Sequence, residues 1–285
     1  MTTSAASVAA PESRPARHTG SKLLRALVCI SAAITVLILI SLVVYILIKG
    51  VPNLKPELFA RKYTSDNCSM LPAILNTITV TLISLLFAVP LGVGSAIYLA
   101  EYAKRGSRLV RLVRLTTETL AGIPSIVYGL FGYLMFTIAL KFGYSLLSGI
   151  LTLSIMVLPT IMRTTEEALV AVPDLYREGS FGLGAGRLRT VWRIVLPSAM
   201  PGIASGVILA IGRIVGETAA LIFTSGTDTG VAGLTSSGRT LAIHMYALWN
   251  EGLHMEAAYA TGVVLLILVV GINALASYAA KKVER

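Results

Sequence analysis

Arg213 and Glu217 are the charged residues of an otherwise uncharged stretch over positions 198–223. A guanidinium presents its N–H groups as a fork that binds the oxygens of a phosphate-like anion in pairs. A carboxylate four residues away could pair with that arginine, or accept a proton from a protonated oxyanion. On a continuous helix both side chains project from one face. The spacing leaves two interpretations open: a polar site that handles an anion, and an internal ion pair that fixes helix packing.

Long apolar segments must position these charges. The chain has 285 residues, of which 55% are hydrophobic and 13% are charged, about half the charge of an ordinary soluble domain. A helix crosses a bilayer with about 20 apolar residues. We therefore predict an all-α membrane protein with six transmembrane helices, preceded by a disordered tail over residues 1–22. The predicted spans are 23–48, Met70–Ala100, Thr119–Leu140, a fourth that ends at Met162, Ser198–Phe223 and Ala257–Ala280, so that five of them form a core over 70–280. The first span is longer than the apolar part of a signal peptide, which is the rival interpretation.

The basic residues predict the orientation of these spans. The tail, the loop after the second span, the segment 163–197 and the C-terminus hold 17 of the 24 Lys and Arg residues. Because short cytoplasmic loops carry an excess of Lys and Arg, both termini and the 163–197 segment are predicted to be cytoplasmic. The net charge of +10 is then a consequence of topology, and no nucleic-acid binding is expected. Residues 224–256 form a predicted outer loop with a short helix over 241–250.

The polar segment 163–197 is long for a loop between two spans. Asp174, directly after Pro173, favours a helix start. Glycines at 182, 184 and 186 favour a sharp exit, because glycine enters the left-handed region at little cost. A second short helix over Arg187–Val195 is expected to end before Pro197. The pattern predicts two helices joined by a glycine elbow, a shape that can fill a groove on a partner.

This segment resembles the signature loop of the permease subunits of ABC importers. Its match consists of Glu178, Gly179, Ser180, Gly184, Ile194, Leu196 and Pro197, at the signature's spacing. Gly179 and Ser180 replace the two alanines of the signature by other small residues. The resemblance implies the type I importer permease fold and assigns these seven residues to contact with a separate ATPase.

Two further motifs resemble phosphate-specific permeases of the PstA type. They are Arg163-Thr164-Thr165-Glu166 and the stretch Gly212–Ala219. The resemblance covers roughly residues 70–280, and it favours Arg213, Glu217, Arg163 and Thr164 as residues of a substrate pathway. From its position alone, Arg163 is better explained as an anchor at the lipid head groups.

The same resemblance implies an assembly in a bacterial cell membrane. Its expected members are a PstC-type second permease subunit, a PstB-type ATPase dimer and an external PstS-type phosphate-binding protein. Inorganic phosphate would be the transported solute. The alternatives are a permease for another oxyanion or polar solute, a self-contained channel, and an intramembrane enzyme that uses Glu217 as an acid or base.

Several chemistries have no motif in this chain. No Gly-x-x-x-x-Gly-Lys-Ser/Thr loop is present, so ATP and Mg²⁺ are expected on the partner ATPase, with no cofactor bound here. Cys29 and Cys68 are isolated, and the three histidines show no metal-binding spacing. We expect neither a metal site nor a catalytic residue.

Overall fold

The computed structural model describes residues 19–104 and 106–283, and all regular secondary structure in these ranges is helical. The helices are α1 (Thr19–Gly50), α2 (Leu71–Ile97), α3 (Arg108–Ala121), α4 (Ser125–Gly132), α5 (Leu146–Val170), α6 (Asp174–Gly182), α7 (Arg187–Thr190), α8 (Leu196–Val215), α9 (Ala219–Thr224), α10 (Leu241–Glu251) and α11 (Met255–Val283). Single π-helical turns extend α2 over Tyr98–Tyr102 and α4 over Tyr133–Ala139, and a third joins α7 to α8 over Val191–Val195. The chain divides into two compact units, residues 1–45 and 46–285.

The first unit contains most of α1. The predicted tail over 1–22 lies outside the described residues up to position 18, whereas residues 19–22 already belong to α1. From Leu24 onward the helix carries exposed apolar side chains, among them Leu27 and Leu37. A helix that is apolar on all sides is typical of a membrane span.

The second unit is organised around α5, which packs most extensively against α2 and α8. Leu153, Met156 and Val157 of α5 are completely or almost completely buried in its largest apolar cluster. Small residues allow the helices to approach closely: a Cβ added at Gly206 of α8 would overlap the side chain of Thr164. A Cβ at Gly132 would overlap Thr152 in the same way. Such glycine contacts are the usual means by which membrane helices pack.

The number of spans agrees with the predicted six if one bent pair counts as a span. Five helical stretches are long and apolar enough to cross a membrane: Leu24–Asn53, Leu71–Tyr102, Leu146–Val170, Arg187–Val215 and Met255–Tyr278. A sixth would consist of Arg108–Ala121 and Ser125–Ala139, which are bent by 103° relative to each other. The predicted third span, a single helix over Thr119–Leu140, is therefore wrong. Pro124 has no N–H and disfavours helical geometry at the preceding residue, so the chain turns there.

Three other predicted helix ends also differ. The fourth span continues past Met162 to Val170. The helix that begins at Arg187 does not end before Pro197 but continues through the π-helical turn into α8. The wider turn relieves the clash between a proline ring and the carbonyl four residues earlier. Finally, the fifth span is not one helix over Ser198–Phe223, because α8 ends at Val215 and α9 begins at Ala219.

Candidate functional site

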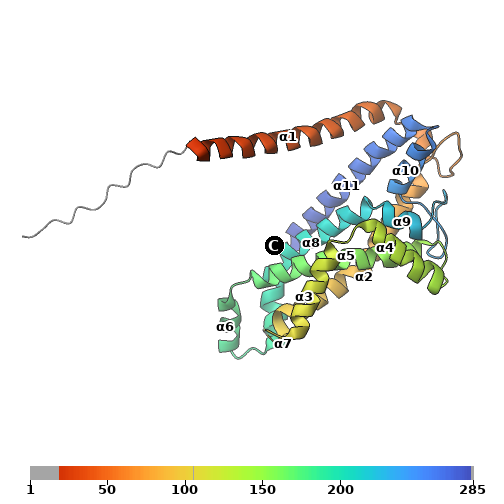
Figure 1. Ribbon diagram of the computed structural model, residues 1–285. Helices are drawn as coiled ribbons and strands as arrows, with labels where there is room; N and C mark the ends of the chain where they lie inside the picture. Colours follow the sequence, from red (N-terminus) through yellow and green to blue (C-terminus); the bar gives the residue numbers. More distant parts are fainter. Residues whose placement is uncertain (1–18, 105, 284–285) are drawn as a thin grey trace, which may run out of the picture. The chain divides into compact units, whose positions relative to one another are not determined.

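The predicted pair of helices joined by a glycine elbow is present between α5 and α8. Here α6 begins at Asp174 directly after Pro173, as expected, and Gly184 forms the elbow with a φ of 82°. A residue with a Cβ rarely adopts this left-handed conformation, whereas glycine does so freely. We refer to residues 174–197 as the coupling segment. Figure 1 shows α6 and α7 at one end of the second unit, with α9 and α10 at the other.

A hydrogen bond between Ser180 and Thr190 closes the elbow. Their hydroxyl oxygens are 2.8 Å apart, and both residues are buried. Because the Thr190 hydroxyl donates to the carbonyl of Gly186, Ser180 must be the donor to Thr190. Ser180 therefore holds the two arms of the coupling segment together, while Glu178 and Gly179 beside it are exposed.

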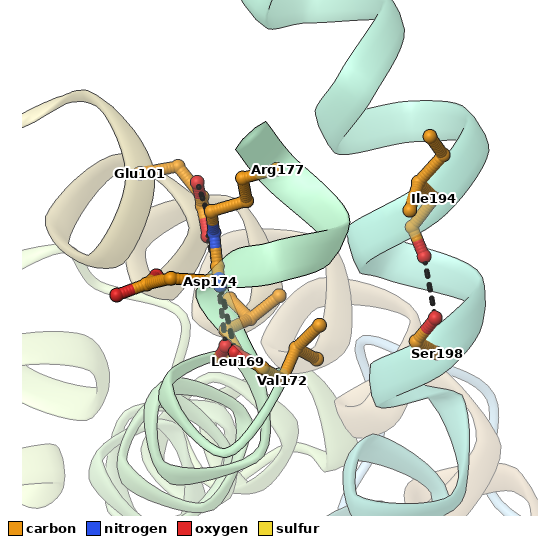
Figure 2. Close-up of polar contacts among 7 residues, drawn as sticks. All are labelled: Glu101, Leu169, Val172, Asp174, Arg177, Ile194 and Ser198. Carbon is orange, nitrogen blue, oxygen red and sulfur yellow. Dashed lines mark hydrogen bonds and ion pairs between the residues drawn. The ribbon is translucent and has the colours of Figure 1, made fainter. Parts of the chain in front are cut away.

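Arg177 fastens α6 to the membrane helices (Figure 2). Its Nη2 lies 2.6 Å from Glu101 Oε1, at the end of the second span, and also donates to the carbonyl of Leu169 at 2.9 Å. Its Nη1 donates to the carbonyl of Val172 at 2.7 Å and to Asp174 Oδ1 at 3.2 Å. The guanidinium thus donates to carbonyls at and just after the C-terminal end of α5 and neutralises a buried carboxylate. One side chain links α6 to the ends of two spans.

The coupling segment exposes apolar side chains on both arms and at the elbow. Leu183 is 92% and Leu175 is 77% exposed, and Leu188 and Trp192 lie exposed on the second arm. A groove of about 560 Å³ lies between the arms, and Arg189, Arg193 and Ile194 line one side of it. Contiguous exposed apolar surface with a charged rim is typical of a protein interaction site.

The end of the signature lies in a continuous helix. Ile194 is partly buried and its carbonyl accepts a hydrogen bond from Ser198 Oγ at 2.7 Å (Figure 2). Leu196 and Pro197 form the first turn of α8. The second arm of the coupling segment is therefore continuous with α8, the helix that carries Arg213.

Arg213 and Glu217 lie on either side of a helix break. Gly216 caps the C-terminus of α8, and Glu217 follows it. The buried Glu217 accepts a hydrogen bond at Oε1 from the backbone N–H of Ala220 at 3.0 Å, which stabilises the start of α9. No hydrogen bond or ion pair joins Arg213 to Glu217 or to any other described residue. The two residues are therefore not on one face of a helix, and the structure contains no internal ion pair between them.

Arg163 and Thr164 lie within α5, not after its end. The exposed Arg163 donates from Nε to Glu167 Oε1 at 2.9 Å, one turn along the helix. The hydroxyl of Thr164 donates to the carbonyl of Thr160 at 2.9 Å, and its side chain faces Gly206 of α8. The structure brings Thr164 to a helix contact and leaves Arg163 on the surface beside an acid.

Comparison with known proteins identifies the family. Residues 88–285 match the model of the binding-protein-dependent transport system inner membrane component. The chain belongs to this family. It is therefore a multi-pass membrane permease, a transporter subunit and not an enzyme.

Curated relatives match the permease over most of its length or over about half of it. A protein of Bacillus subtilis (strain 168), "Probable ABC transporter permease protein YqgI", is 34% identical over 276 residues, which is 90% of this chain and 94% of that protein. The "Phosphate transport system permease protein PstA 1" of Mycobacterium tuberculosis (strain CDC 1551 / Oshkosh) is 42% identical over 150 residues. That match covers 53% of this chain and 49% of the relative.

A solved structure supports the predicted fold. A chain of a bacterial alginate ABC transporter, in complex with its pentasaccharide-bound periplasmic protein, superposes with a TM-score of 0.70 at 17% identity. The superposition covers 94% of the permease and 97% of that chain. The fold is that of an ABC importer permease, as the sequence predicted.

Sequence reasoning missed Arg177 and Glu101. They are 76 residues apart in the sequence, so no local pattern joins them. A signal was nonetheless present: Glu101 is the first charge after a long apolar run, and Arg177 lies within the segment that the permease signature marks.

Proposed function

We propose that this permease is one of two membrane subunits of an ATP-driven importer of inorganic phosphate. One observation carries the proposal: Arg213 lies in a membrane span, partly buried, without a carboxylate or other partner among the described residues. A charge in this position costs about 2.5–3.5 kcal/mol on insertion scales and usually faces a polar cavity or a ligand. An anion is the ligand that an unpaired guanidinium binds. The relatives named as phosphate permeases support phosphate as that anion.

The other pathway residues have different parts in this proposal. Glu217 positions α9 next to Arg213 and, because it does not pair with the arginine, leaves the guanidinium free for the anion. Thr164 sets the distance between α5 and α8. Arg163, on the surface of α5, would lie at the inner mouth of the pathway.

The coupling segment would dock into the ATPase. Of its assigned residues, Glu178, Gly179 and Gly184 lie in the exposed first arm and elbow. Ile194, Leu196 and Pro197 lie in the helix that leads from the second arm into α8, and Ser180 holds the shape of the elbow. ATP and Mg²⁺ would be bound by the ATPase dimer and not by this chain. The remaining proposed partners are a PstC-type permease subunit and a PstS-type external protein. The assembly would lie in the bacterial cytoplasmic membrane, with both termini of this chain and the coupling segment on the cytoplasmic side.

Labelled phosphate uptake into vesicles that contain the assembled complex tests the proposal. Loss of the charge-assisted contacts of Arg213 would cost about 1.5–3 kcal/mol, so Arg213→Ala is expected to lower uptake by roughly 10- to 150-fold. The matched control is Arg61→Ala, which removes the same charge from an exposed loop. Normal uptake by Arg213→Ala would remove Arg213 from the pathway. Uptake of sulfate or molybdate without phosphate would overturn the substrate and keep the permease.

A further inference from the structure

Arg239 resembles Arg213: among the described residues it is shielded from solvent and has no anionic partner. It lies in the predicted outer loop and is only 4% exposed, and its Nε and Nη2 have no hydrogen-bond partner. No described carboxylate forms an ion pair with it. A buried and unpaired charge is strongly unfavourable, so an arginine in this state points to a ligand that completes it.

The surrounding structure holds Arg239 in place. Its backbone N–H donates to the carbonyl of Asp228 at 2.9 Å, and its own carbonyl accepts a hydrogen bond from Asn76 Nδ2 of α2 at 3.1 Å. The guanidinium lies over the ring of Tyr63, 4.5 Å from the centroid. Stacking on an aromatic face leaves the N–H groups at the edge of the guanidinium free to bind. The Arg239 guanidinium is therefore preorganised for binding in the absence of a ligand.

The pocket beside Arg239 offers further polar groups. It has a volume of about 480 Å³, and Thr227, Thr229, Tyr246 and Asn250 are among its lining residues. Hydroxyl and amide groups of this kind donate hydrogen bonds to oxyanions. Glu251 is the one carboxylate of the lining, and it is exposed.

A buried histidine next to Arg239 does not replace the missing partner. His244 is fully buried beside the backbone of Cys68, and neither ring nitrogen completes a hydrogen bond of normal geometry. Burial, together with the charge of Arg239, lowers the pKa of His244 from 6.5 to about 3. The ring is therefore neutral at physiological pH, and the positive charge of the pocket comes from Arg239.

Helix α10 contributes Tyr246 and Asn250 to the lining of the pocket. This helix lies at the end of the second unit opposite α6 and α7 (Figure 1). Ile222 of α9 contributes to its lining. The same short helix begins beside Glu217, at the break that follows Arg213. Along the chain, the break at Gly216–Thr218 and the start of α9 thus connect Arg213 to Ile222 in the pocket lining.

We propose that the Arg239 pocket is an outer binding site for inorganic phosphate, which the anion occupies before it reaches Arg213. This inference rests on the proposed function, because it assigns an additional site on the path of the same substrate. A tetrahedral oxyanion matches the paired N–H groups of the guanidinium and leaves oxygens for the neutral donors of the pocket. A carboxylate on the external binding protein is the competing occupant.

Binding of labelled phosphate to the purified complex, without the external binding protein and with ATP hydrolysis blocked, tests the outer site. Arg239→Gln is expected to weaken phosphate binding at least tenfold, and Arg239→Lys to weaken it less because the charge remains. The matched control is Arg61→Gln, which removes an exposed charge of the same predicted outer side. The melting temperatures of the complexes show whether each variant is folded. If Arg239→Gln does not fold, the phosphate affinity of Arg239→Lys is compared with that of the wild type instead.

Each result decides between specific statements. Wild-type affinity in Arg239→Lys and in a folded Arg239→Gln would overturn the outer site. The outer site would also be overturned if the wild-type complex transports phosphate but binds none under these conditions. In that case the proposed function would still stand. Docking of the external binding protein to the same variants is measured separately. If Arg239→Gln binds phosphate normally but no longer docks that protein, the outer phosphate site is overturned and the pocket is assigned to a protein carboxylate. A complex that transports another anion and not phosphate would refute the proposed function itself.

Discussion

Removal of Arg177 should release α6 from the membrane helices without unfolding the rest of the permease. In Arg177→Gln, the Glu101 carboxylate, whose side chain is 8% exposed, loses its cationic partner. Removing one member of a buried pair costs about 3–5 kcal/mol, because the other charge stays buried. If this cost falls on the local attachment of α6, the open state of that helix becomes roughly 150- to 5,000-fold more populated.

Hydrogen–deuterium exchange of the α6 amides in the purified complex measures this population. Asp174→Asn is the matched comparison, since it removes a contact of the same guanidinium at 3.2 Å from a side chain that is 66% exposed. An exposed pair contributes about 0–1 kcal/mol, so exchange should rise by no more than roughly fivefold.

The double variant Glu101→Gln/Arg177→Gln gives the sharpest test. It contains neither buried charge, so its α6 amides should exchange more slowly than those of Arg177→Gln alone. Exchange equal to the wild type in Arg177→Gln would refute the argument that this residue attaches α6. The two residues would not be coupled if the fold increase in exchange of the double variant equals the product of the fold increases of Glu101→Gln and Arg177→Gln.

Three further predictions concern the elbow, a helix contact and the response to acid. Position 184 has open space around it but a left-handed backbone, which costs an ordinary residue about 1–2 kcal/mol. Phosphate uptake should therefore be highest in the wild type, lower in Gly184→Asn and lowest in Gly184→Val. Equal uptake by the two variants would contradict this. Gly206→Val should lower the melting temperature of the permease, because overpacking costs about 1–3 kcal/mol. Adding Thr164→Ala to this variant should restore part of the lost melting temperature. No restoration would mean that the contact with Thr164 does not cause the loss of stability. Because the unfolded chain protonates His244 below about pH 6.5 and the folded chain only near pH 3, stability should be lost as the pH falls, by about 1.4 kcal/mol at pH 5.5. His244→Gln should reduce that loss between pH 7.5 and 5.5, as measured by melting, and an unchanged pH dependence would argue against a buried neutral imidazole.

The sequence predicted the features that depend on composition and local geometry. Apolar length located most of the spans. The glycines at 182, 184 and 186 marked the elbow, and the structure shows that Gly184 is the left-handed one. The signature spacing identified the coupling segment and, through it, the family.

The sequence could not predict features that depend on distant or competing contacts. The break between α8 and α9 was missed because an uninterrupted apolar run shows no end, and the Glu217 side chain starts the new helix by a hydrogen bond to Ala220. Pro197 was expected to end a helix, but the π-helical turn before it accommodates the ring. The attachment of α6 by Arg177 and Glu101 joins two segments that only the fold brings together.

The glycine contacts of α5 also have a consequence for how such sequences can diverge. At Gly206 facing Thr164, and at Gly132 facing Thr152, the two positions share a space that is already filled. A larger residue on one helix is tolerated only if its neighbour becomes smaller, so natural variants should exchange volume across each pair while the sum of the two side chains stays nearly constant. The permease could therefore change its residues in evolution at these sites only in compensating pairs, whereas its lipid-facing positions vary one at a time.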